Sequence, residues 1–187
     1  MDSQAETSGI AAEFCIGQKI VYPSQGVGII QNIVEKQFKL EKIPYYVIYL
    51  EVTDMTIMMP ISKALELGIR AIVSPEYAEQ ALQLIGEAFD PIPSDWKLRY
   101  QMNYDLLKKG SILDIAMIVR SLFHRSQVKD LPIQERKLYD SAFKLLEDEV
   151  ASSLQKPKEE INALIWSRLT PQADQPDQVV QIDEQQE

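Results

Sequence analysis

The sequence has little of the two side chains that most often build metal and nucleophilic sites. Its 187 residues include one cysteine, Cys15, and one histidine, His124. A single cysteine excludes an intramolecular disulfide and a CxxC metal motif. A Cys–His pair would require Cys15 to meet His124, which we expect to end a helix, where a positive charge is favourable. Phosphate-binding glycine loops and an HExxH motif are also missing. We therefore expect no enzyme, no metal and no cofactor, and a protein of the reducing cytoplasm.

A long hydrophobic run is missing as well. A transmembrane helix needs about 18 consecutive apolar residues, whereas the long uninterrupted apolar stretches here, such as residues 115–119, are far shorter. Residues 1–13 contain no basic segment followed by an apolar run. We therefore expect no secretory signal and no contact with a membrane.

The acidic charge is concentrated at the two ends of the chain. The formal net charge is −9, of which residues 1–13 carry −3 and residues 171–187 carry −5. We predict that segments 1–13 and 170–187 are disordered acidic tails, because they are polar and poor in aromatics. Residues 95–145 instead hold ten Lys and Arg against six Asp and Glu. The net charge therefore does not exclude nucleic acid as a partner, because binding depends on where cations cluster.

The first half of the chain has the pattern of short β-strands. Its apolar runs are rich in β-branched and aromatic residues and are separated by turn residues. Four or five short strands in about 50 residues are too few for two sheets, so we predict a small Tudor- or SH3-like β-barrel over residues 14–66. The predicted strands are Lys19–Tyr22, Val27–Phe38, Tyr45–Val52 and Met55–Pro60.

The second half has helical periodicity and helix-capping residues. Ser74-Pro75 is a typical helix start, and Gly110 is a typical helix stop. The pattern predicts an all-α domain of five helices over residues 74–169, and the fold class is therefore α+β. The predicted helices are Glu76–Ala88, Asp95–Lys109, Ile112–His124, Pro132–Leu154 and Pro157–Leu169.

Trp96 is the most informative side chain of the helical half. At 100° per residue, Leu98, Met102 and Leu106 form an apolar stripe that we expect to face the core. Trp96 then lies about 160° away from that stripe, at the start of its helix and beside Lys97. One interpretation is an aromatic side chain that stacks on or inserts between bases while nearby cations hold phosphate. The alternative is that the helix is buried on two sides and Trp96 packs against a neighbour.

The methionine-rich segment Met55–Pro60 is the other candidate surface. Alternation along a strand places Met55, Ile57 and Met59 on one face and Met58 on the other. If the first three side chains fill the barrel, Met58 lies outside, either as a partner contact or as an ordinary exposed residue.

Five blocks of sequence resemble the CarD/CdnL transcription regulators of bacteria, in the family's order and spacing over residues 14–169. The blocks are Val21–Gly28 (VYPSQGVG), Asp54–Pro60 (DMTIMMP), Gly68–Arg70 (GIR), Trp96–Tyr100 (WKLRY) and Gly110–Ala116 (GSILDIA) followed by Val119–Leu122.

The resemblance implies a bacterial protein whose N-terminal module binds the β subunit of RNA polymerase. The contacting positions correspond to Lys36 and to the strand edge Thr56, Ile57 and Met58. It also implies that the helical domain contacts promoter DNA at the upstream edge of the melted bubble.

In the family, the tryptophan that matches Trp96 inserts into the minor groove, supported by basic residues that match Arg99 and Arg136. Lys97 and Lys137 lie beside these positions in the sequence and complete the predicted DNA-binding set. Two positions depart from the family pattern, since Leu98 and Gln101 stand where basic residues are frequent.

The sequence therefore predicts a monomeric, non-enzymatic regulator of transcription initiation that stabilises the open complex without reading DNA sequence. The alternative is a protein-interaction adaptor that binds RNA polymerase and has no direct contact with DNA. Exposure of Trp96 distinguishes the two interpretations.

Overall fold

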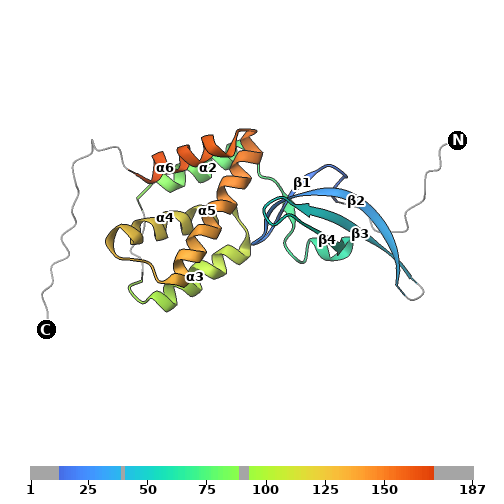
Figure 1. Cartoon of the computed structure of the whole chain (residues 1–187), viewed down its shortest axis with the longest axis horizontal. Helices are drawn as coiled ribbons and strands as arrows, with labels where there is room; N and C mark the ends of the chain where they lie inside the picture. The colour runs from blue at the N-terminus through green and yellow to red at the C-terminus, as the bar shows by residue number, and fades with distance from the viewer. Residues whose placement is uncertain (1–12, 39–40, 89–92, 171–187) are drawn as a thin grey trace, which may run out of the picture.

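The computed structural model describes residues 13–38, 41–88 and 93–170. An N-terminal sheet and a C-terminal group of helices follow one another along the long axis of the molecule (Figure 1). The fold class is α+β, as predicted. The predicted tails fall almost entirely outside the described residues. Within the described residues, no helix combines the length and the apolar character needed to cross a membrane.

The N-terminal half forms one antiparallel sheet of five strands in the order β4-β3-β2-β1-β5. In this order β4 and β5 are edge strands, so the described strands form an open sheet and the predicted closed barrel is not confirmed. The reason is that the fifth strand has only two residues and pairs with β1 alone among the described strands. The strands are β1 Lys19–Tyr22, β2 Gly26–Phe38, β3 Glu41–Leu50, β4 Met55–Pro60 and β5 Arg70–Ala71.

The sheet buries one face, as its alternating side chains require. Tyr46, Ile48 and Leu50 of β3 point inward and are almost fully buried. Met59 joins this core as predicted, whereas Met55 at the start of β4 is exposed. A β-bulge between Ile30 and Asn32 shifts the β2–β3 register, and such a bulge bends its strand and increases the twist.

The described residues contain six helices, one more than predicted. The additional helix is a single turn that directly follows β4 and packs under the sheet. The cap predicted at Ser74 is formed, because its hydroxyl accepts from the Tyr77 N–H, and Gly110 ends its helix in the left-handed conformation at φ 71°. The helices are α1 Ile61–Ala64, α2 Pro75–Gly86, α3 Trp96–Lys109, α4 Ile112–Val128, α5 Ile133–Leu154 and α6 Lys158–Leu169.

Helix α4 is the centre of the helical domain. It contacts α2, α3 and α5, and its residues Ile112, Ile118, Val119 and Leu122 are fully buried. Such an apolar helix can be surrounded on several sides without burying unpaired charge, which makes it the element against which the other helices pack.

The orientation of α3 differs from the prediction. The predicted core residues Leu98 and Met102 are about half exposed, at 53% and 49%. The buried residues of this helix are Arg99, Asn103 and Leu107. Apolar periodicity gave the wrong face because burial of Arg99 is made possible by a partner on another helix, which a search for apolar side chains does not detect.

The sheet and the helices meet directly. Gly26, the first residue of β2, lies against α5, and a Cβ atom at this position would come within 3.3 Å of Leu145. Its φ of 92° also belongs to the left-handed region that favours glycine. The neighbouring Pro23 packs on Gly110, the residue that joins α3 to α4. The two domains therefore share a close-packed joint.

Candidate functional site

Trp96 lies at the end of α3 that points away from the sheet domain. It is the first residue of α3, and the Asp95 side chain caps this helix end by accepting from the Lys97 N–H at 2.9 Å. The other end of α3 meets the sheet domain at Gly110 (Figure 1). The Trp96 side chain keeps 37% of its surface exposed. The indole is therefore not enclosed in the helical core, and it is available to a partner.

Arg99 does not lie on the surface, which corrects the expectation that it contacts DNA. It is 3% exposed and faces the fully buried Glu135 of α5. Two parallel hydrogen bonds of 2.7 Å join the Arg99 guanidinium to the Glu135 carboxylate. A third bond, of 2.6 Å, runs from Arg99 to the carbonyl oxygen of Pro93. Arg99 thus fixes the segment before Trp96 to the start of α5, and it supports Trp96 from inside the protein.

The Arg99–Glu135 pair brings together the cations that the sequence predicted. Because the starts of α3 and α5 are joined, Lys97 on α3 lies at the same end of the domain as Arg136 and Lys137, which directly follow Glu135. All three cations are exposed, and none of them forms an ion pair with another described residue. These cations therefore place positive charge at the same end of the domain as the exposed indole. Such a surface suits nucleic acid, which has negative phosphates and aromatic bases.

The second predicted surface is the free edge of the sheet. Thr56, Ile57 and Met58 lie on β4, where they pair with Tyr49, Ile48 and Val47 of β3. Met58 is 42% exposed, as predicted for a side chain outside the sheet core. The side of β4 that faces away from β3 has no strand partner among the described residues. An edge of this kind can accept another strand through its backbone N–H and C=O groups.

Lys36 is not adjacent to this edge. It lies on β2 and pairs with Ile43 of β3, whereas β4 covers β3 only from Tyr45 onward. Lys36 is exposed and therefore occupies the projecting end of the β2–β3 ribbon, beyond the end of β4. The structure places the two predicted polymerase contacts on one domain but on separate strands.

No metal or nucleophilic centre is evident in the part of the chain that the structure describes. This part contains no group of three or more His, Cys, Asp or Glu side chains placed to hold a metal ion. Cys15 precedes the sheet, whereas His124 lies in α4 beside the Phe123 ring. Burial, followed by the nearby Arg120, lowers the pKa of His124 below its ordinary value of 6.5.

Comparison with known proteins agrees with this architecture. Residues 14–73 match the CarD-like/TRCF RID domain, and residues 80–166 match the CarD C-terminal domain. A protein of Bacillus subtilis (strain 168) named "Putative transcription factor YdeB" is 39% identical over 139 residues, which cover 73% of this chain and 90% of that protein.

The chain belongs to the CarD/CdnL family of transcription regulators. The first match ends in the segment that connects β5 to α2, and the second begins inside α2. The sheet domain of this CarD-family protein is thus of the RNA polymerase-interacting kind. The domain that carries Trp96 is the CarD C-terminal domain.

Proposed function

We propose that this CarD-family protein binds the β subunit of bacterial RNA polymerase through its sheet domain and stabilises the promoter open complex. In this proposal the tip of the helical domain contacts the upstream edge of the DNA bubble without reading its sequence. The observation that carries the proposal is the exposed Trp96 at the start of α3, at the same end of the helical domain as the exposed cations Lys97, Arg136 and Lys137. The protein acts in the cytoplasm as a monomer and catalyses no reaction.

The free edge of β4 supplies the polymerase contact. A strand of the polymerase that pairs with Thr56–Met58 would gain main-chain hydrogen bonds, and Met58 would cover the junction with a flexible apolar side chain. This contact would hold the helical domain next to the DNA at an effective concentration of about 1 mM. Weak DNA contacts are then sufficient.

Trp96 and the cations supply the DNA contact. Stacking of a base on an aromatic ring is worth about 1–3 kcal/mol, while separating two stacked bases costs a few kcal/mol. The insertion is therefore favourable mainly where the duplex is already distorted, as at the edge of a melted bubble. Phosphate contacts from Lys97, Arg136 and Lys137 fix position and carry no sequence information.

The test measures how long open promoter complexes persist after addition of a competitor, with wild-type protein and with Trp96→Ala. We expect wild-type protein to lengthen the lifetime, and Trp96→Ala to lose most of this effect while it still binds polymerase and unfolds at the wild-type temperature. Met102→Ala is the matched control, because Met102 is an exposed apolar residue of the same helix.

Equal lifetimes with wild-type protein and Trp96→Ala would contradict the proposal. If polymerase binding persisted in that case, the result would favour an adaptor without DNA contact. A footprint of the upstream bubble edge, with and without the protein, locates the contact independently.

A further inference from the structure

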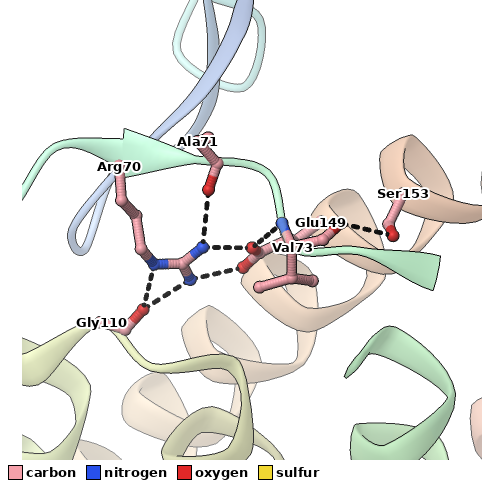
Figure 2. Close-up of polar contacts among 6 residues, drawn as sticks. All are labelled: Arg70, Ala71, Val73, Gly110, Glu149 and Ser153. Carbon is pink, nitrogen blue, oxygen red and sulfur yellow. Dashed lines mark hydrogen bonds and ion pairs between the residues drawn. The ribbon is translucent and has the colours of Figure 1, made fainter. Parts of the chain in front are cut away.

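Arg70 joins the sheet domain to two separate parts of the helical domain. It lies on β5, the last strand of the sheet, and its guanidinium reaches Glu149 of α5 and the carbonyl oxygen of Gly110 (Figure 2). Nη2 donates to Glu149 Oε2 at 2.8 Å and to the Gly110 oxygen at 2.6 Å. Nε donates to the same Gly110 oxygen at 3.1 Å, and Nη1 binds Glu149 Oε1. One side chain thus fixes the sheet to α5 and to the α3–α4 junction.

The segment that connects the two domains is fixed by the same helix. Glu149 also accepts from the Val73 N–H at 3.3 Å, and Ser153, one turn further along α5, donates to the Val73 carbonyl oxygen at 2.8 Å (Figure 2). The Glu149 side chain is 2% exposed, so its charge is removed from water and depends on Arg70 for compensation. The connecting segment is therefore held to α5 at Val73 on both its N–H and its carbonyl group, and it is not a free hinge.

The joint lies at one end of α3, and Trp96 lies at the other. With 14 residues in α3 and a rise of about 1.5 Å per residue, Trp96 stands about 20 Å from Gly110. A rotation of about 15° at the joint would therefore displace the indole by about 5 Å, more than the thickness of one base step. A small change of angle at the joint therefore produces a large displacement of Trp96.

From this geometry we infer that Arg70 is a positioning residue that fixes the direction of Trp96 relative to the polymerase-binding edge of β4. Arg70 contacts neither proposed partner surface, and it acts through Glu149 and Gly110. Its planar guanidinium suits this task, because it binds a carboxylate with two parallel hydrogen bonds and therefore fixes orientation as well as distance. The inference rests on the proposed function for the role of Trp96, whereas the rigid joint can be tested independently.

The first measurement is the distance between the two domains in the full chain. One spin label is attached to Cys15, the single native cysteine, which is exposed before the sheet. The other is attached to a cysteine introduced by Gln134→Cys, at an exposed position near the start of α5. We expect a narrow distance distribution for the labelled wild-type background and a clearly broader one after Arg70→Ala. Arg70→Lys keeps the charge but loses the two-point contact, so we expect intermediate broadening.

The second measurement is the lifetime of open promoter complexes with the unlabelled variants. If the released joint leaves about one tenth of the molecules in the productive orientation, the apparent affinity for the open complex falls about tenfold. We expect Arg70→Ala to need about ten times more protein than the wild type for the same lengthening of the lifetime. Polymerase binding in the absence of promoter DNA should be unchanged. Lys63→Ala is the control, because it removes an exposed ion pair with Glu66 inside the sheet domain and should alter neither measurement.

If Arg70→Ala fails to fold, Glu149→Gln provides a second way to weaken the joint, because it keeps the shape of the Glu149 side chain and removes its charge. Unchanged distance distributions in both variants would overturn the inference. Broadened distributions with wild-type open-complex lifetimes would also overturn it, provided that Trp96→Ala shortens the lifetime. If even wild-type protein leaves the lifetime unchanged, the proposed function fails, and the distance measurement alone decides whether Arg70 locks the joint.

Discussion

Arg99 and Glu135 form a fully buried, two-point ion pair although they lie 36 positions apart in the sequence. The pair links the start of α3 to the start of α5. It also presents the residues on either side of it to solvent at one end of the domain, with Trp96 and Lys97 from α3 and Arg136 from α5. A structural pair in the interior thus organises the candidate DNA-binding surface.

Loss of one partner of this pair should be costly. We expect Glu135→Ala to lower the free energy of unfolding by about 3–5 kcal/mol, because the Arg99 charge would stay buried without compensation. Urea unfolding followed by circular dichroism measures the effect. Replacing both residues by apolar ones, as in Arg99→Met with Glu135→Leu, should restore most of the stability. If the double variant were as unstable as the single one, the buried charge would not be the cause.

The polymerase contact should depend on Met58. We expect Met58→Glu to weaken pull-down of RNA polymerase, because a carboxylate in the centre of an added strand interface would be desolvated without a partner. Leu67→Glu, at another exposed apolar position of the same domain, is the matched control.

Lys36 should contribute separately from Met58, since it lies beyond the end of β4 on another strand. We expect the losses caused by Lys36→Ala and Met58→Glu to add when the two are combined, as for distant sites. Pull-down at a series of polymerase concentrations measures each loss. Full binding by the double variant would place the interface elsewhere.

The exposed cations should make binding to the polymerase–promoter complex sensitive to salt. Each phosphate contact that is lost should reduce the slope of log affinity against log salt concentration by about 0.9 on duplex DNA. We therefore expect Arg136→Ala and Lys137→Ala each to flatten this slope, and their combination to flatten it further. Lys63→Ala, on the sheet domain, should leave the slope unchanged. A wild-type slope in the double variant would show that these cations do not reach phosphate.

His124 should make the helical domain less stable in mild acid. Burial, followed by Arg120, lowers the pKa of His124 in the folded protein, so the unfolded chain takes up a proton more readily. Stability is then fully present above the ordinary pKa of 6.5 and decreases as the pH falls below it toward the folded value. Urea unfolding at pH 7.5 and pH 5.5, compared between wild type and His124→Gln, isolates this contribution. A loss in acid of the same size in both proteins would assign the effect to other groups.

Local sequence signals predicted most of the secondary structure. The strands β1 and β4 have the predicted bounds, and Ser74 and Gly110 mark the predicted helix start and stop. These features depend on near neighbours, because capping, left-handed glycine and β-branched runs act within a few residues. The exposure of Met58 also agrees with its position in the strand alternation. The sequence left the exposure of Trp96 open, because the apolar stripe used to orient α3 is itself largely exposed.

Pairing between distant residues could not be predicted in this way. The burial of Arg99 depends on Glu135, and the domain joint depends on contacts between Arg70 and Glu149, which lie 79 positions apart. Neither arginine is distinguishable from a solvated one by periodicity, since the energy that buries it resides in its partner.

The sequence by itself determined the α+β class and the order of the four longer strands and the five longer helices, because each of these depends on short-range chemistry. Only the tertiary structure decided which face of α3 is buried, that the sheet stays open and that the two domains share a fixed joint. These outcomes depend on ion pairs and packing between segments that meet only after the chain has folded.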